Sequence, residues 1–409
     1  MKSLVTVTAL FLFGSTLNLL SAQDSLLVAT IRQHTYQLSL SEQNFSGDGA
    51  AVLQEAMKAP QFLLVGEQHG IVEVGAFTNA LLKAARPLGF EYFCVETDPF
   101  IAKKLEQLVG EGKPALDDFV KAFPLSIPFY DNQEDFQMLT TALEAGKGQL
   151  PTLWGVDQVF AAAPRYLFQR LTEIAPDAKA KALAADYLKK GREGLQAVMK
   201  NGDFNQMILN QLEEKDFTQL FTAFGNDPQS ESTQIIQGMM KTKEIYAAWY
   251  AGKYHQNNLI RSKLMKKQFM EYYREAEKLD PTPKVVFKFG ATHTYRGLSY
   301  YQVFDLGNLV SELAAMNEME SLHIHFTGIK GKANSGLQGE QSFDSQKDIA
   351  PEIWEAIADR AEGQEWILVD MRPLREKFGR RKLKPIKSEV FNYDFWIFVP
   401  EATPVTTIR

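Results

Sequence analysis

The sequence predicts an α/β fold: a mostly parallel, duplicated sheet with flanking helices and an inserted helical cap. Short apolar runs bounded by glycine alternate with helix-like segments towards both ends of the chain, which is typical of parallel sheets. The same Gly-x-x-His motif follows an apolar run twice, from Gly66 to His69 and from Gly290 to His293. Between the two motifs lies a long stretch whose apolar spacing is mostly helical.

The N-terminal residues 1–22 have the pattern of a signal peptide. Lys2 provides the charged start, residues 4–13 the apolar middle, and Leu20-Ser21-Ala22 a small-residue cleavage site. The alternative is a membrane anchor, but polar residues interrupt the run, no basic stop follows it, and no cysteine follows it for lipid attachment. We therefore expect a secreted protein, periplasmic in a bacterium, with no integral membrane segment after cleavage.

The first α/β half is expected at residues 50–160. Its strands are expected at 62–65, 90–95 and 152–157, and its helices at 50–57, 100–109 and 132–145. Residues 123–131 contain two prolines, which exclude a regular helix, so we expect a loop over the site there. Asp157, after the third strand, is either the N-cap of the next helix or a functional residue.

The helical cap is expected at residues 161–279, and the second α/β half at 280–409 completes the same core. An apolar stripe at helical spacing in the cap is interpreted as core: Ile260, Leu264, Met265, Phe269, Tyr272 and Ala276. Strands are expected in the second half at 285–289, 322–326, 366–370 and 395–399, with a helix at 308–316. Residues 330–348 are rich in Gly, Ser, Gln and Lys and predict a mobile surface loop. The basic run at 378–387 is interpreted as a solvated face.

Composition narrows the class of partner. The chain has 409 residues, 45% of them hydrophobic and 23% charged, as in soluble globular proteins. The formal charge of −6 and the lack of basic runs with interleaved aromatic residues argue against a nucleic-acid partner. The single cysteine, Cys94, excludes an intrachain disulfide, and its place inside an apolar run indicates a buried thiol and not a nucleophile.

Candidate catalytic residues stand where the apolar runs end. Glu67 and His69 follow the first run, Glu96 follows the second, and His293 follows a run in the second half. The carboxyl ends of strands in open α/β sheets are where ligands bind, so the two imidazoles are expected to face one cleft. The sequence has no Gly-x-Ser-x-Gly elbow, no Walker loop, no Gly-x-Gly-x-x-Gly after a strand and no His-Glu-x-x-His.

These residues are suited to two kinds of chemistry. His69 can take a proton from water while a carboxylate on its other nitrogen fixes its tautomer, a role that suits Glu96, although Glu67 could fill it. His293 or Arg296 would then stabilise the oxyanion of a hydrolysed acyl group. The same two histidines and carboxylates could instead hold divalent zinc, manganese or iron. The pair His323 and His325 could chelate zinc too, but no further ligand accompanies it and a structural role is favoured.

The motifs resemble those of the erythromycin-esterase-like family, within a wider superfamily that includes haem-uptake ChaN-like proteins and TraB/Tiki-type proteases. The resemblance is carried by Gly66-Glu67-Gln68-His69-Gly70, by Glu96, by Gly155-Val156-Asp157, by Gly290-Ala291-Thr292-His293, by Arg261, by Tyr295-Arg296-Gly297 and by Tyr393-Asp394. It implies that His69 is the general base, supported by Glu67, Glu96 and His293. Arg296, Tyr130, Asp157 and Arg261 are expected to bind the substrate.

The resemblance leaves three functions open. The first is a secreted hydrolase that cleaves an ester, lactone or amide of a small molecule. The family's esterases carry His-Asn-x-His at the second motif, whereas this chain has Ala291-Thr292-His293, which argues against a macrolide substrate. The second is a haem- or iron-binding uptake protein of the ChaN-like type, with Tyr130, Tyr295 or a histidine as axial ligand. The third is a metal-dependent protease of the Tiki type.

Overall fold

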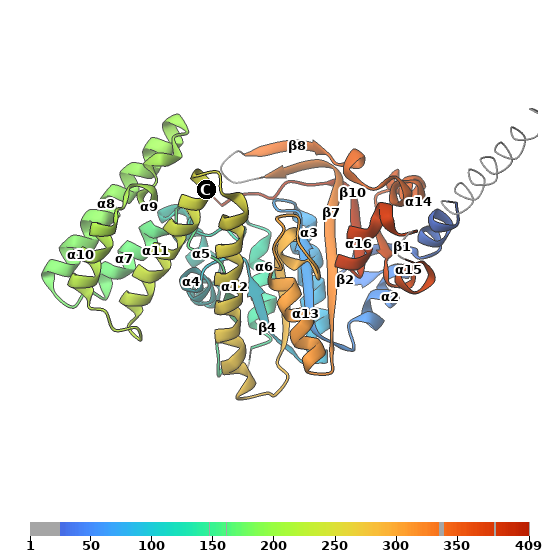
Figure 1. The fold of residues 1–409 in the computed structure, drawn as a ribbon, viewed down its shortest axis with the longest axis horizontal. Helices are drawn as coiled ribbons and strands as arrows, with labels where there is room; N and C mark the ends of the chain where they lie inside the picture. The colour runs from blue at the N-terminus through green and yellow to red at the C-terminus, as the bar shows by residue number, and fades with distance from the viewer. Residues whose placement is uncertain (1–24, 147, 161, 335–338, 380–381, 409) are drawn as a thin grey trace, which may run out of the picture.

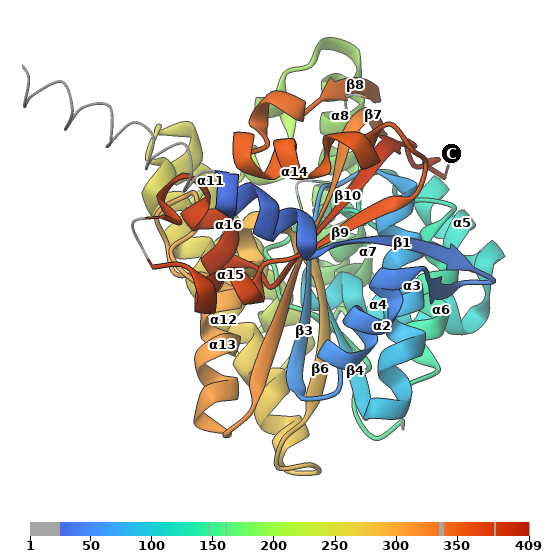
Figure 2. The same cartoon turned by 90° about the vertical axis from the view of Figure 1, so that its right-hand side faces the viewer.

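A computed structural model describes residues 25–146, 148–160, 162–334, 339–379 and 382–408, so the expected signal peptide lies outside the described residues. Its centre is a ten-stranded sheet between layers of helices (Figures 1 and 2). The strands are β1 (Thr35–Ser41), β2 (Asn44–Ser46), β3 (Pro60–Glu67), β4 (Phe90–Val95), β5 (Leu153–Gly155), β6 (Lys284–Gly290), β7 (Glu320–Asn334), β8 (Glu340–Asp344), β9 (Trp366–Asp370) and β10 (Phe395–Ala402).

The strand order is β2-β1-β9-β10-β7-β3-β6-β4-β5, and β8 pairs with β7 outside this path. The neighbours from β10 to β5 pair in parallel, whereas β1, β2, β8 and β9 make antiparallel pairs. The predicted α/β class with a mostly parallel sheet is therefore confirmed. Because β6, from the second half of the chain, lies between β3 and β4, the two halves share one sheet.

Helices cover both faces of this sheet, which explains why β3 is buried along its whole length. Leu63 and Val65 pack towards α3 (Val72–Ala85), α4 (Pro99–Glu111) and α6 (Asp135–Leu143). Phe62 and Leu64 belong to the opposite core layer, which includes residues of α12 (Tyr254–Glu277) and α13 (Leu306–Met316). Other helices outside the cap are α2 (Asp48–Ala56), α5 (Lys113–Ala122), α14 (Pro351–Ala361), α15 (Arg372–Lys377) and α16 (Lys387–Asn392), and residues 25–33 before β1 are helical too.

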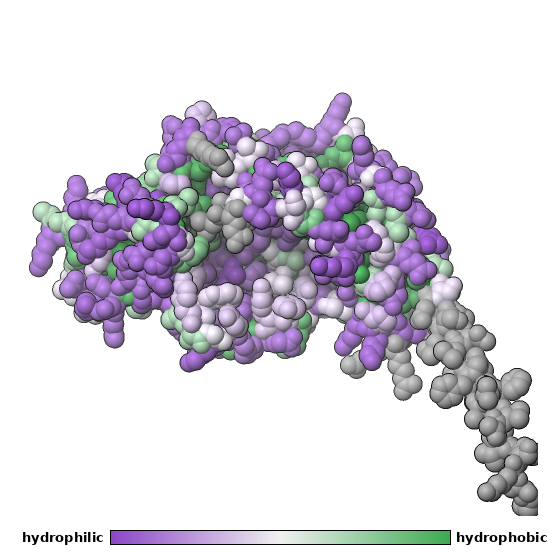
Figure 3. All heavy atoms as spheres, turned by 90° about the horizontal axis from the view of Figure 1, so that it is seen from above, coloured by the Kyte–Doolittle hydropathy of each residue, from purple (hydrophilic) through white to green (hydrophobic). Residues whose placement is uncertain are grey.

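A lobe of helices lies beside the β5 end of the sheet, at the left of Figure 1. It contains α7 (Pro164–Glu173), α8 (Ala178–Asn201), α9 (Ile208–Gln211), α10 (Glu214–Phe224) and α11 (Glu231–Tyr250). Helix α12 follows the lobe and packs Met265, Phe269 and Tyr273 against the sheet. Seen from above, the molecule is hollowed between the lobe and the rest of the chain, and hydrophilic residues lie in the hollow (Figure 3).

Two regions differ from the sequence-based expectation. The expected mobile loop at 330–348 is wrong for its described part, because β7 continues to Asn334 and β8 pairs back onto it, from Lys330 with Asp344 to Asn334 with Glu340. The sheet also includes β1 and β2, which lie before the first expected strand; β1 pairs with β9 at the far edge. No helix in the described part of the chain is long and apolar enough to cross a membrane.

The contact between β5 and α4 provides a test of the packing. A Cβ atom on Gly155 would lie 2.5 Å from the Asp98 carbonyl oxygen and 2.6 Å from the Ala102 Cβ atom. Gly155→Ala should therefore lower the free energy of unfolding by about 1–3 kcal/mol. Gly110→Ala, in the α4 helix that Gly155 packs against, is the matched control, because nothing lies within 4 Å of its added Cβ. It should raise the stability by up to about 1 kcal/mol, and urea denaturation of both variants checks the pair.

Candidate active site

Four neighbouring strands bring the polar residues together at one edge of the sheet. Glu67 ends β3 and pairs in register with Gly290 of β6, and Glu96 directly follows β4. His293 lies in the 3-10 turn that follows β6, and Asp157 lies just beyond β5. A cleft of about 520 Å³ opens at this edge; Glu67, His69, Glu96, Asp157, Arg261 and His293 are among the residues that line it.

His69 is held by the carboxylate at the end of its own strand. Its Nδ1 lies 2.9 Å from Glu67 Oε1, and the Lys288 ammonium lies 2.9 Å from the same carboxylate. Burial favours the neutral acid, but Lys288 and His69 outweigh it and keep the pKa of Glu67 below its usual range. Because Glu67 is ionised, it favours a proton on Nδ1 of His69. The tautomer-fixing role expected for Glu96 therefore belongs to Glu67.

The Nε2 side of His69 opens to the cleft. Its Nε2 lies 3.7 Å from Glu96 Oε2, and the His69 side chain is 33% exposed. A Cβ atom on Gly290 would lie 2.8 Å from this nitrogen, so the glycine of the second motif leaves room for the histidine of the first. The Phe129 ring stacks on the imidazole, with centroids 3.8 Å apart and planes at 6°. Nε2 of His69 therefore faces the cleft.

Glu96 is a buried carboxylate with several positive partners. Its Oε2 accepts a hydrogen bond from the Gly290 N–H at 2.6 Å, and its Oε1 accepts one from Arg261 at 2.8 Å. Burial raises the pKa of Glu96, but His293, His69, Arg261 and the Gly290 amide together lower it to about 2. Glu96 therefore stays ionised and places a fixed negative charge between the two imidazoles.

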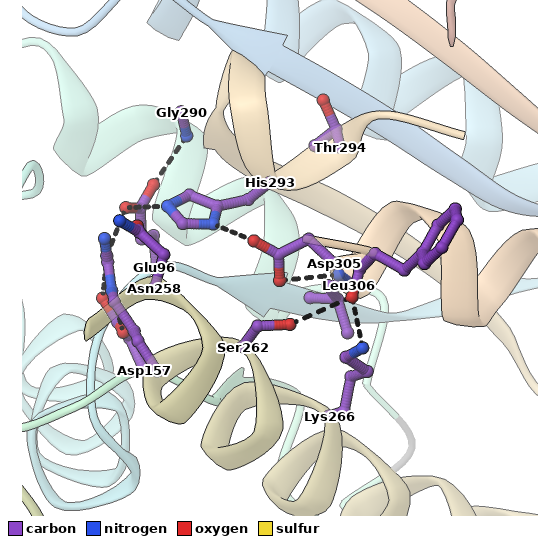
Figure 4. A network of polar contacts seen from close by, with 12 residues as sticks. Glu96, Asp157, Asn258, Ser262, Lys266, Gly290, His293, Thr294, Asp305 and Leu306 are labelled. Carbon is purple, nitrogen blue, oxygen red and sulfur yellow. Dashed lines mark hydrogen bonds and ion pairs between the residues drawn. The ribbon is translucent and has the colours of Figure 1, made fainter. Parts of the chain in front are cut away.

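His293 is held from the other side by an aspartate that the sequence analysis did not identify. Its Nδ1 lies 2.8 Å from Asp305 Oδ2 and its Nε2 lies 3.5 Å from Glu96 Oε1, as Figure 4 shows. Burial and Arg261 lower the pKa of His293, but Asp305 and Glu96 outweigh them and raise it above its usual value. The two carboxylates beside His293 therefore favour its imidazolium form.

Arg261 joins α12 to the sheet edge. Its guanidinium donates to both carboxylate oxygens of Asp157, at 2.8 and 2.5 Å, and also to Glu96. The attraction of Asp157 and Glu96 for the guanidinium outweighs burial and keeps the pKa of Arg261 well above its usual value. Both residues expected to bind substrate here, Arg261 and Asp157, therefore lie in the wall of the cleft.

The other two residues expected to bind substrate lie elsewhere. Tyr130 is fully buried, and its hydroxyl donates to the Lys288 carbonyl oxygen at 3.3 Å. Arg296 donates to Asp394 at 2.6 Å and to the Ser321 carbonyl oxygen at 3.1 Å, on the side of β7 and β10. Neither side chain lines the cleft in this structure.

The His-x-His pair on β7 has structural contacts. His323 is buried and its Nδ1 lies 2.7 Å from the Thr294 carbonyl oxygen. The His325 ring packs against Trp396 with centroids 4.0 Å apart. Burial lowers the pKa of each histidine to about 3, so both are neutral at ordinary pH.

Three residues of the site were missed from the sequence, and two of them, Lys288 and Asp305, had a signal in it. Lys288 interrupts an otherwise apolar buried strand, which is unusual for lysine unless it is paired. Asp305 stands at the N-cap of α13, where its other oxygen accepts from the Leu306 N–H at 2.8 Å. Phe129 lies in the proline-containing loop that was expected over the site, but its stacking on His69 could not be read from spacing.

The four candidate catalytic residues, Glu67, His69, Glu96 and His293, do not form a ready set of metal ligands. Glu67 is committed to Lys288 and to His69, and Glu96 to Arg261 and the Gly290 amide. A cation would have to displace these positive partners from both carboxylates. Across the described part of the chain, no group of three or more His, Cys, Asp or Glu side chains is placed to hold a metal ion.

Comparison with solved structures identifies the fold. The chain resembles erythromycin esterase EreC, in a histidine-to-asparagine mutant in its open conformation, with a TM-score of 0.55 and 14% identity over 88% of this chain and 95% of that one. A succinoglycan biosynthesis protein has a TM-score of 0.60 and 14% identity, covering 94% and 98% of the two chains. A Bacillus cereus protein has a TM-score of 0.56 and 13% identity, covering 94% and 99%. No protein-family model and no curated protein matches the sequence. The chain therefore has the erythromycin-esterase fold.

The ion pair between His293 and Asp305 predicts a defined pH dependence. Asp305→Asn should lower the pKa of His293, because it removes the negative charge at Nδ1 and retains a cap for α13. In the folded wild type this pKa is raised, so its contribution to stability is present below the unfolded value of about 6.5 and is lost as the pH rises through the folded value.

The stability difference between wild type and Asp305→Asn should accordingly be larger below about pH 6.5 than at alkaline pH. Histidine NMR titration measures the pKa of His293, and urea denaturation at several pH values measures the stability difference. An unchanged His293 titration in the variant would show that Asp305 does not set its charge.

Proposed function

We propose that the protein is a hydrolase that cleaves an ester, lactone or amide bond of a small molecule with water activated by His69. The observation that carries the proposal is the arrangement of His69: Nδ1 is bonded to ionised Glu67, and Nε2 faces the cleft 3.7 Å from Glu96. The shared fold with EreC, an erythromycin esterase, supports the same class of reaction. The pattern of residues 1–22 supports action outside the cytoplasm.

In this mechanism a water molecule binds between His69 Nε2 and the Glu96 carboxylate. His69 takes one proton of that water as its oxygen attacks the carbonyl carbon. The imidazolium that forms is stabilised by Glu67, whose own charge is balanced by Lys288. Glu96 accepts the second hydrogen of the water and so orients the oxygen for attack. No covalent intermediate between enzyme and substrate is needed.

The positive groups across the cleft stabilise the charge that develops on the substrate. His293, held as an imidazolium by Asp305, presents Nε2 to the cleft, and Arg261 adds a second positive charge. Either group can donate to the oxyanion of the tetrahedral intermediate. When the bond to the leaving oxygen or nitrogen breaks, His69 returns its proton to that atom, which gives an acid and an alcohol or amine.

His69→Ala should abolish turnover of a responsive ester while the fold persists. Loss of a general base lowers kcat by about 10²–10⁴-fold, so the variant should fall at least a hundredfold on a panel of 4-nitrophenyl esters and lactones. Circular dichroism and the urea midpoint check that the variant is folded.

His34→Ala is the matched control, because His34 precedes β1 at the far side of the sheet from the cleft. It should retain wild-type kcat. Full activity of His69→Ala would remove the proposal. Loss of wild-type activity after dialysis against a chelator would favour a metal-dependent hydrolase or protease, and a Soret band on titration with haem would favour a haem-binding protein.

A further inference from the structure

A second pocket, of about 220 Å³, lies next to the cleft and is separated from it by a shared wall. Glu67, His69, Pro128, Phe129 and Phe160 line both spaces. The Phe129 ring, which stacks on His69, is part of that wall. A group that enters this pocket would lie within one ring's thickness of the proposed base. We call it the inner pocket.

The inner pocket is walled mainly by apolar side chains from several elements. Ile71 and Val74 come from the start of α3, Leu125 and Ile127 from the loop after α5, and Val405 from the C-terminal segment. Cavities of about 150 Å³ accept a benzene ring, so this pocket has room for a compact branched group. Its apolar wall favours a group that carries methyl or methylene carbons.

The inner pocket has more carboxylates than positively charged groups in its lining. Lys288 is paired with Glu67 at 2.9 Å, which uses its positive charge. Asp135 accepts one hydrogen bond, from Asn132 at 3.0 Å. Asp131 is only 9% exposed and lines the pocket, and within the described ranges no other residue donates a hydrogen bond to its carboxylate. Lys288 also attracts Asp135, so one lysine serves two carboxylates, and within the described ranges Asp131 has no positive partner.

Burial raises the pKa of Asp131 and of Asp135 to about 6, so both are largely ionised above neutral pH. Buried carboxylates are costly unless a positive group pairs with them. Phe129 and Phe160 add aromatic rings to the same walls, and aromatic rings attract alkylammonium groups. Carboxylates, rings and aliphatic carbons together make a lining that suits a cation surrounded by carbon.

We propose that the inner pocket binds an alkylammonium group through Asp131 and Asp135. As a property of the pocket this inference stands on its own; the further statement that the ammonium belongs to the substrate rests on the proposed function. The hydrolysed bond would then lie on the cleft side of Phe129, beside His69. The class of substrate inferred is an ester or amide that carries a tertiary or quaternary amine near the bond that is cleaved.

Binding of two isosteres tests the pocket without reference to activity. Choline and 3,3-dimethylbutan-1-ol have the same shape, but only choline carries a positive charge. Calorimetry at pH 7.5 should show choline binding to the wild-type protein at least about tenfold more tightly than the neutral alcohol. Asp131→Asn should remove most of that difference. Asp118→Asn is the matched control, because Asp118 is exposed on α5 and its loss changes the net charge equally.

Equal affinity for the two isosteres, or an unchanged preference in Asp131→Asn, would overturn the inference. Because Asp131→Asn could also disturb the loop, Asp135→Asn is measured in parallel, and retention of the preference by both variants counts against the pocket.

Hydrolysis of choline esters and of the matching 3,3-dimethylbutyl esters then tests the link to catalysis. We expect a higher kcat/KM for the charged ester in the wild-type protein and a loss of that preference in Asp131→Asn. Choline binding without hydrolysis of either ester would sink the proposed function and leave the ammonium site standing. Hydrolysis of both esters at equal rates, without choline binding, would overturn the ammonium site and leave the proposed hydrolase function standing.

Discussion

The site depends on one buried carboxylate, that of Glu96. An ionised side chain that is almost fully buried is tolerated only where hydrogen bonds and opposite charges replace water. Glu96 receives these from three parts of the chain: the Gly290 amide of β6, the Arg261 guanidinium of α12, and His293 after β6. Removing any of these partners would leave the carboxylate undersatisfied, so the position of α12 and the turn after β6 are tied to it.

A second buried pair makes the site asymmetric. Lys288 and Glu67 are each only 4% exposed, and their pairing lets Glu67 stay ionised and hold the Nδ1 proton of His69. Asp305 occupies the corresponding place at Nδ1 of His293, and its positive neighbours besides that histidine, Arg261 and Lys266, come from α12 and not from a strand. In the proposed mechanism His69 accepts the proton, and the raised pKa of His293 favours its imidazolium. The two Gly-x-x-His motifs are therefore alike in sequence, but the carboxylates that hold their histidines have different counter-ions.

The sequence was sufficient for those parts of the structure that local pattern determines. Buried parallel strands appear as continuous apolar runs, and β4 and β9 begin and end at the predicted residues. Convergence of Glu67, Glu96 and His293 followed from their positions at strand ends. The insertion of β6 between β3 and β4 was not derivable, because strand order depends on contacts distant in sequence. Tyr130 and Arg296 were wrongly expected in the cleft because spacing alone does not say which way a side chain points.

The loop that carries Phe129 is the part of the site where a change in conformation would affect both spaces at once. Phe129 and Leu125 adopt positive φ angles of 62° and 61°, a region that costs a non-glycine residue about 1–2 kcal/mol. Contacts of the Phe129 ring offset that cost: it stacks on His69 and also packs against Phe160, which precedes the cap. Phe129 is therefore one of the residues through which the packing of this loop shapes both the cleft and the inner pocket.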